Sequence, residues 1–332
     1  MGKAHKPRRG SVAHSPRKRS GRQYPTIKNW PEGGSEPKIQ GFAGYKAGMT
    51  HAFVVDYRPT STTSGQEVQI PVTVVEVPPL KVAGIRLYDR DAYGMRTTKE
   101  IWSDKIDKNL IRRLPVPKKA EKPQLKGLEK TDAEEVRLVV HTLPVSVKGV
   151  PSKKPEIMEI NVGGGTLEQR IKYAKDLLGK EIPFSEFQVE GAMVDIIAVT
   201  KGKGFQGLNK RFGVKLLTHK NSKHRRMLGT QGPWHPAWIM STVPNSGQMG
   251  YHKRTEYNKR ILKVGKDPSE INVKGGFLHY GPIENSYVLI HGSIPGPTKR
   301  LIRFRDPVRL HGHVEVRTPD LTFISTSSKQ GK

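Results

Sequence analysis

The sequence contains no cysteine among its 332 residues. This absence excludes disulfide bonds, thiolate metal sites and cysteine nucleophiles. The N-terminus also lacks the apolar stretch of a secretory signal, and the chain has neither an apolar run of about 20 residues nor an amphipathic basic helix of the kind that lies on a membrane. We therefore expect an intracellular protein without a membrane partner.

Acidic residues are scarce, and over two long stretches they are absent. The chain has 58 Lys and Arg against 30 Asp and Glu, a formal net charge of +28. Residues 1–31 contain nine Lys or Arg and residues 196–255 contain eleven, with no acid in either stretch. An ordinary solvated surface would intersperse Glu and Asp with Lys, and like charges at this density repel one another unless a polyanion is bound. The pattern favours a nucleic-acid partner.

The residue patterns of common catalytic and cofactor sites are missing as well. Gly202-Lys203 lacks the spaced glycine and the following Ser or Thr of a phosphate-binding loop, and the glycines at 163–165 do not follow a dinucleotide-binding pattern. His311 and His313 have no companion ligand at a metal-site spacing. We expect no enzyme activity, no cofactor, no metal and no small-molecule substrate.

The first 37 residues are rich in Pro, Gly, Ser and Arg and show little apolar periodicity. Such a segment cannot offset its ordering entropy by burial, so we expect an extended basic tail. The alternative is a disordered terminus without a function. Residues 16–19 also resemble a nuclear-localisation patch, which is a weak and common pattern.

Short runs rich in β-branched and aromatic residues indicate strands through most of the chain. Their number and irregular spacing are typical of an antiparallel barrel or sandwich. The expected strands are Met49 to Asp56, Gln69 to Val77, Val82 to Tyr88, Val136 to Thr142, Val194 to Thr200, Tyr287 to Ile290, Leu301 to Phe304 and Val314 to Arg317.

Helix signals are confined to the middle of the chain. Thr166 and Gln169 have the spacing of a capping box, and apolar residues follow at helical spacing as far as Leu178. A second helix is expected from Lys105 to Arg113. The Pro- and Lys-rich residues 115–130 are typical of a surface loop. Together these features predict an α+β insertion at 91–182 between barrel strands.

Residues 201–255 lack periodic hydrophobicity and mix Gly, Lys, Arg, His and aromatic residues. A loop of this length inside a compact domain is usually functional or disordered. Lys and Arg neutralise phosphates, and flat side chains stack on unpaired bases, so the composition suits an arm that penetrates RNA. Trp234, His235 and Trp238 are the candidate stacking residues. The alternative is that these aromatic residues form a small core beneath the loop.

Several motifs resemble the ribosomal protein L3 family of the large subunit, in its archaeal form. They include Asp195, Ala198 and Thr200, then Lys201-Gly202-Lys203-Gly204-Phe205-Gln206-Gly207 and Lys210-Arg211, then Gly232-Pro233-Trp234-His235-Pro236-Ala237 and Gly247-Gln248-Met249-Gly250-Tyr251-His252. In the tail, Pro7-Arg8-Arg9-Gly10-Ser11 and Pro16-Arg17-Lys18-Arg19 are similar to the family's opening. The likeness runs nearly end to end.

The resemblance implies a mainly β protein, with an antiparallel β-barrel of the translation-protein type and an α+β insertion. It also implies a tail and an internal finger loop that thread into rRNA, with the finger directed toward the peptidyl-transferase centre. The expected parts are the basic tail at 1–37, the first part of the barrel at 38–90, the insertion at 91–182, a barrel strand at 183–200, the finger at 201–255, and the rest of the barrel with the C-terminus at 256–332. Eukaryotic members have an aromatic residue near the finger tip where Ser241 stands here, which makes Trp238 the candidate substitute.

The resemblance further implies a cytoplasmic structural protein that supports early assembly of the large subunit. Its expected partners are large-subunit rRNA and neighbouring ribosomal proteins, without homo-oligomerisation. The expected RNA-binding residues are Lys3, Lys6, Arg8, Arg9, Arg17, Lys18, Arg19, Arg22, Lys201, Lys203, Lys210, Arg211, Lys215, Lys220, Lys223, His224, Arg225, Arg226, Trp234, His235, Trp238, His252, Lys253 and Arg254.

Two other classes share the basic charge. An architectural DNA binder would favour duplex DNA over rRNA, but the sequence shows no helix-turn-helix or zinc-finger pattern. An RNA-modifying enzyme could use basic arms to capture its substrate, but it would need a cofactor site.

Overall fold

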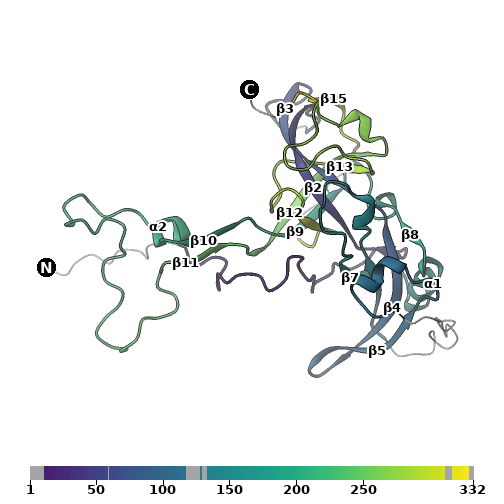
Figure 1. Ribbon diagram of the computed structural model, residues 1–332, viewed down its shortest axis with the longest axis horizontal. Coiled ribbons are helices and arrows are strands. Elements are labelled where there is room, and N and C mark those ends of the chain that lie inside the picture. The colour runs from purple at the N-terminus through teal and green to yellow at the C-terminus, as the bar shows by residue number, and fades with distance from the viewer. Residues whose placement is uncertain (1–10, 59, 117–127, 129–132, 311–315, 329–332) are drawn as a thin grey trace. The chain divides into compact units, whose positions relative to one another are not determined.

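The computed structural model describes residues 11–58, 60–116, 128, 133–310 and 316–328 (Figure 1). It forms two compact units, one of Met1–Gln23 with Val199–Arg254 and the other of Tyr24–Ala198 with Thr255–Lys332. Four expected RNA-binding residues, Lys3, Lys6, Arg8 and Arg9, lie outside the described residues, as do most of the loop expected at 115–130 and the start of the strand expected at 314–317. The fold is mainly β with antiparallel sheets, as the sequence predicted.

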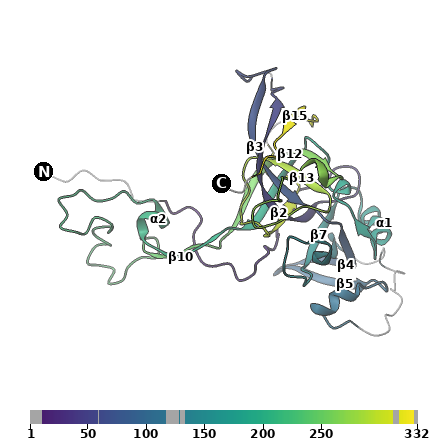
Figure 2. The same cartoon turned by 45° about the horizontal axis from the view of Figure 1, so that its top comes forward.

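Seven strands of the described residues form one sheet, in the order β14-β9-β12-β13-β3-β2-β15, and β14 also pairs with β2. The long strands β2 and β3 pair as a hairpin (Figure 2). Valines on β3 fill the interior, because β-branched residues suit a pleated, buried surface. The strands are β2 (Gly41–Val55), β3 (Glu67–Glu76), β9 (Met193–Val199), β12 (Lys253–Gly265), β13 (Tyr287–His291), β14 (Leu301–Arg305) and β15 (Leu321–Ile324).

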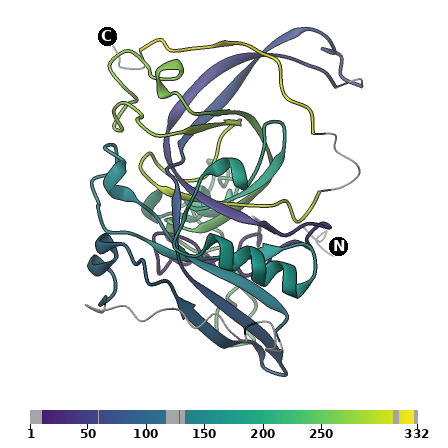
Figure 3. The ribbon, with the colours of Figure 1, turned by 90° about the vertical axis from the view of Figure 1, so that its right-hand side faces the viewer.

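A second sheet of the larger unit has the order β1-β7-β6-β4-β5, with β8 paired to β4. Helix α1 contacts β4, β6 and β7 (Figure 3). We expected β4 among the barrel strands, but it pairs with β5, β6 and β8 instead. The elements are β1 (Lys38–Ile39), β4 (Leu80–Asp91), β5 (Gly94–Trp102), β6 (Glu135–His141), β7 (Ile157–Gly163), α1 (Leu167–Leu177) and β8 (Glu181–Ile182).

The capping box expected at the start of α1 is confirmed. The Gln169 backbone N–H donates to Thr166 Oγ1, and the Thr166 backbone N–H donates to Gln169 Oε1 at 3.0 Å. The helix then buries Ile171, Ala174 and Leu177, which matches the helical spacing of the apolar residues.

Several elements differ from the sequence predictions. The helix expected at Lys105 to Arg113 is only the short 3₁₀ helix η1 (Lys108–Arg112), with the Asp107 side chain accepting the Asn109 backbone N–H. The prediction that helices are confined to the middle of the chain was wrong, because α2 (Leu208–Phe212) lies in the finger segment. The other elements are η2 (Pro144–Ser146), η3 (Phe184–Glu186), η4 (Pro268–Glu270), β10 (Gly202–Gln206) and β11 (Gly247–Gly250). Strands β1, β5, β7, β8, β10, β11, β12 and β15 were not predicted. Residues 316 and 317, the described part of the strand expected at 314–317, are not in a strand.

Four phenylalanines pack in the core of the larger unit. Phe184 of η3 meets Phe42 edge-to-face at 5.1 Å between ring centroids, and it meets Phe304 in the same way at 5.5 Å. Phe187 completes the group, and all four side chains are buried. Edge-to-face pairs of this kind stabilise a core beyond the area that they bury.

Two structural features are absent from the residues that the structure describes. None of the helices there is long and apolar enough to cross a membrane. The same residues include no group of three or more His, Asp or Glu side chains placed to hold a metal ion.

Candidate nucleic-acid interface

The smaller unit is built on the two-stranded ribbon of β10 and β11 (Figure 1). The pairing continues past β11, where the Tyr251 backbone N–H donates to the Lys201 carbonyl at 3.1 Å. Gly250, the last residue of β11, has φ +74°, and a Cβ at this position would lie 2.1 Å from the Lys201 carbonyl oxygen. Only glycine allows this close approach, which explains its place in the motif.

The N-terminal tail lies along this ribbon. The Ser20 backbone N–H donates to the Tyr251 carbonyl at 2.8 Å. The His252 ring accepts the Gly250 N–H at Nε2, at 3.0 Å, and its Nδ1 lies 2.9 Å from the Lys18 carbonyl. Because Nε2 is an acceptor, a neutral ring carries its proton on Nδ1 and donates it to Lys18. His252 is buried, and its ring holds the backbone of the tail.

Arg17 of the tail and Arg211 of α2 contact each other beside the β10–β11 ribbon. The Arg17 guanidinium lies 4.1 Å from the Phe212 ring centroid, and the Arg211 guanidinium lies 5.1 Å from it. Arg17 donates to the Arg211 carbonyl, and Arg211 donates back to the Arg17 carbonyl at 3.2 Å. Arg211 also donates from Nε to the Gln248 carbonyl at 2.9 Å. Two cations are thus held side by side through backbone acceptors.

No Asp or Glu occurs in the two stretches that form this unit. Burial lowers the pKa of Arg17, and the neighbouring charge of Arg211 lowers it further. Burial and the charge of Arg17 likewise lower the pKa of Arg254. Crowded cations without carboxylates create a positive potential that an anion would relieve.

A hollow of about 350 Å³ opens beside β10 and α2. It is lined by Lys203, Gln206, Lys210 and Met249. Both lysine side chains are exposed, so this hollow offers two ammonium groups to an anion.

Residues 213–246 run as turns and irregular backbone. The Leu217 N–H donates to the Arg225 carbonyl at 3.0 Å, which closes a loop. The Trp234 and Trp238 side chains are 89% and 71% exposed. The small core that was the alternative for these aromatic residues is therefore not formed.

Nearly all the described residues of the predicted RNA-binding set lie on the surface. The exposed ones are Lys18, Arg19, Arg22, Lys201, Lys203, Lys210, Lys215, Lys220, Lys223, His224, Arg225, Arg226, Trp234, His235, Trp238 and Lys253, while Arg17, Arg211 and Arg254 are half-buried. The sequence reasoning missed Phe212 and Gln248, which hold the arginines. No local pattern marks such contacts, since Arg17 and Arg211 are 194 positions apart.

The contact between His252 and the tail gives a first prediction. We expect His252→Ala to raise the amide hydrogen-exchange rate of Ser20 roughly 5- to 100-fold, because losing a buried hydrogen bond costs about 1–3 kcal/mol. The exposed His224→Ala serves as the matched control. Equal exchange at Ser20 in both variants would show that His252 does not hold the tail.

The family model and the similar proteins agree on one family. The family model described as Ribosomal protein L3 matches residues 1–331. The protein named large ribosomal subunit protein uL3 from Picrophilus torridus is 54% identical over 333 residues, covering 100% of both chains. Its namesake from Thermoplasma acidophilum is 51% identical, with 100% of both chains covered. The one from Archaeoglobus fulgidus is 52% identical, covering 99% of this chain and 100% of its own.

Proposed function

Because the chain belongs to the ribosomal protein L3 family, we propose that its acid-free unit binds large-subunit rRNA. Membership makes it a structural constituent of the large ribosomal subunit in the cytoplasm, and not an enzyme. Its similarity to archaeal relatives over the full length agrees with the archaeal form suggested by the motifs.

One observation carries the RNA-binding proposal. The tail and finger join in a unit that contains no carboxylate, and its arginines pack against one another and against Phe212. Bringing Arg17, Arg211 and Arg254 together costs electrostatic energy in the free protein. RNA phosphates would repay that cost by neutralising the cluster and releasing their own counterions.

We also propose that the seven-stranded sheet of the larger unit closes into a barrel. The pairings β14–β9, β9–β12, β12–β13, β13–β3, β3–β2 and β2–β14 return to their starting strand, which supports a closed barrel. We retain the predicted division into tail, barrel, insertion and finger as a proposal, with β4 moved to the insertion. The barrel would then present the RNA-binding arms from a rigid scaffold.

We also propose that the finger extends toward the peptidyl-transferase centre and that the chain acts early in assembly. In support of the position of the finger, the exposed rings of Trp234 and Trp238 lie on a segment, 215–246, whose residues are mostly exposed. Neighbouring ribosomal proteins would complete its surroundings. We expect the chain to be present as a single copy per subunit.

Salt-dependent binding tests the proposal. We expect the full-length chain to cosediment with large subunits, and its affinity for large-subunit rRNA to fall about 10³- to 10⁵-fold between 50 and 200 mM salt if it makes six to ten phosphate contacts. Competition with duplex DNA distinguishes rRNA binding from the alternative of an architectural DNA binder. Free migration of the chain in gradients, or a preference for duplex DNA, would refute rRNA binding.

The exposed tryptophans give a second prediction. Large subunits carrying Trp238→Ala should lose translation rate or assembly yield at least about fivefold, since one base stack contributes ~1–3 kcal/mol. The free energy of unfolding of the isolated chain should change by less than about 0.5 kcal/mol, because the side chain is exposed. Tyr93→Ala, at a 98% exposed aromatic of the larger unit, is the control. A matching loss of stability and function would point to a packing role.

A further inference from the structure

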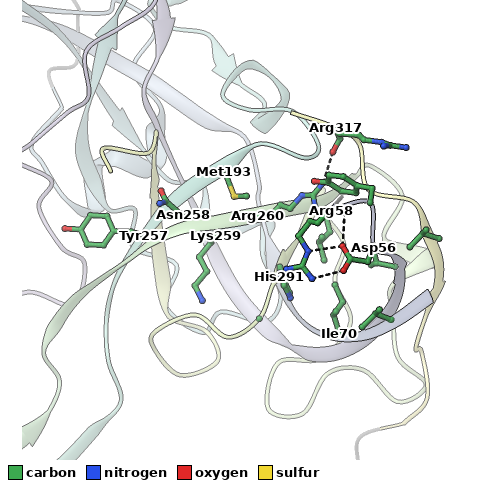
Figure 4. A pocket seen from close by; sticks show the side chains of 16 residues that line it. Asp56, Arg58, Ile70, Met193, Tyr257, Asn258, Lys259, Arg260, His291 and Arg317 are labelled. Carbon is green, nitrogen blue, oxygen red and sulfur yellow. Dashed lines mark hydrogen bonds and ion pairs between the residues drawn. The ribbon is translucent and has the colours of Figure 1, made fainter. Parts of the chain in front are cut away.

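The larger unit contains a cavity of about 950 Å³ (Figure 4). We call it the Tyr57 cavity. It is lined by Val54, Val55, Asp56, Tyr57, Arg58, Val68, Ile70, Met193, Tyr257, Asn258, Lys259, Arg260, Leu262, His291, Gly292 and Arg317. Its volume lies at the upper end of the roughly 300–1,000 Å³ of small-ligand sites.

The lining of the Tyr57 cavity combines apolar side chains with a cationic rim. Val68, Ile70 and Leu262 supply aliphatic surface, whereas the rim contains arginines and a lysine. The Arg260 guanidinium lies 4.2 Å from the Tyr57 ring centroid, and that of Arg317 lies 5.1 Å from it. Figure 4 shows Arg58, Arg260 and Arg317 toward the same end of the cavity as Asp56. Planar groups are thus held in place by contacts with an aromatic ring.

The carboxylate that lines the cavity, Asp56, already has hydrogen-bond donors within the chain. Asp56 accepts two hydrogen bonds from the Arg58 guanidinium, at 2.9 and 2.7 Å, and one from the Thr63 hydroxyl at 2.7 Å. These bonds hold the pKa of Asp56 far below its ordinary range. Lys259 similarly pairs with Glu256 at 2.7 Å. Asp56 and Glu256 therefore form their direct ion pairs with Arg58 and Lys259 and not with the other two arginines of the rim.

Arg260 and Arg317 form no ion pair with a carboxylate of the described residues. Arg260 donates to the Arg317 carbonyl at 2.9 Å, but its buried Nε has no hydrogen-bond partner there. Burial lowers the pKa of Arg260. Two neighbouring guanidinium groups without an anion, next to aliphatic surface, match a ligand that has both a negative charge and a flat apolar part.

We propose that the Tyr57 cavity receives one unpaired nucleotide of the rRNA, with its phosphate at Arg260 and Arg317 and its base against the aliphatic surface. The inference rests on the proposed rRNA binding and adds a second contact site outside the tail and finger. A nucleotide fits better than an acidic peptide because its flat base can lie on the aliphatic surface while its phosphate reaches the two guanidinium groups.

Photocrosslinking of the full-length chain tests this site. The probe is a hexauridylate that contains 4-thiouridine, and the adducts are located by mass spectrometry. We expect adducts on the finger and also on peptides that contain Tyr57 or Tyr257. Arg317→Gln should lower the yield of the cavity adducts about tenfold and leave the finger adducts unchanged, since it removes one charged contact. Its side chain is exposed, so folding is preserved. Arg112→Gln, also exposed and outside the cavity, is the matched control.

The outcomes separate the inference from the proposed function. Finger adducts without cavity adducts would overturn the Tyr57 cavity as a nucleotide site and leave rRNA binding intact. Cavity adducts that survive Arg317→Gln as well as Arg112→Gln would overturn the assigned phosphate position. A complete lack of adducts would overturn both proposals. In assembled subunits, carbodiimide coupling of Lys259 to a carboxylate of another protein would show that an acidic peptide occupies the cavity, and it would overturn the inference.

Discussion

Replacing Lys203, Lys210 and Arg225 together by glutamate is expected to weaken binding to large-subunit rRNA by roughly a thousandfold or more. Each charge-assisted contact contributes about 1.5–3 kcal/mol, and the reversed charges add repulsion from phosphate. All three side chains are exposed, and two of them line the hollow beside α2. The folded chain therefore loses RNA contacts without losing packing.

The salt dependence of binding makes this prediction specific. With three phosphate contacts removed, the slope of log affinity against log salt should become shallower by about 2–3. Filter binding or fluorescence anisotropy over a salt series measures both quantities. The control changes Lys105, Lys172 and Lys180 to glutamate, which alters the net charge equally on exposed residues of the larger unit. Equal losses in the two variants would mean that net charge, rather than the finger, governs binding.

The two acid-free stretches could be identified from the sequence because their signal is contiguous. A run without carboxylates is visible residue by residue, and so is a capping box such as that of Thr166. Strands such as β3 and β13 were found because valine, isoleucine and leucine dominate them. In each case a few neighbouring residues determine the local structure.

The missed elements depend on partners that are distant in the chain. Strand β12 reads as a polar, charged run, yet β13 supplies its hydrogen-bond partners. Strand β5 is mostly exposed and has little apolar periodicity to mark it. Its pairing with β4 through the hairpin compensates for its weak propensity.

The site contacts illustrate the same limit. Composition identified Arg17 and Arg211 as cations, but only the fold brings both to the ring of Phe212. The basic run marks His252 as a candidate RNA contact, but only the fold shows that its ring also bonds to Gly250 and to the Lys18 carbonyl of the tail. The Tyr57 cavity joins residues from six separate stretches of sequence, so no local pattern could reveal it.

Removing the buried carboxylate of Asp195 should produce the largest loss of stability. Asp195 is fully buried on β9, opposite Arg305 of β14. Its Oδ2 accepts from the Arg305 guanidinium at 2.6 Å and from the Val308 N–H at 3.2 Å, and its Oδ1 accepts the Asn258 N–H at 3.1 Å. Asp195→Ala leaves a buried guanidinium and two backbone donors without their acceptor. The free energy of unfolding should fall by about 3–5 kcal/mol, measured by urea denaturation.

A double variant separates the cost of an unpaired charge from the value of the pair itself. Burying two charges requires removing both from water, so the intact pair of Asp195 and Arg305 adds little net stability even though breaking it is costly. Asp195→Ala combined with Arg305→Met should therefore recover part of the loss, because no unpaired guanidinium remains. It should not recover all of it, since the backbone donors of Asn258 and Val308 still lack Asp195 and Arg305 no longer donates to the Asn29 carbonyl. A double variant less stable than Asp195→Ala would instead show that Arg305 stabilises the fold mainly through contacts other than its ion pair.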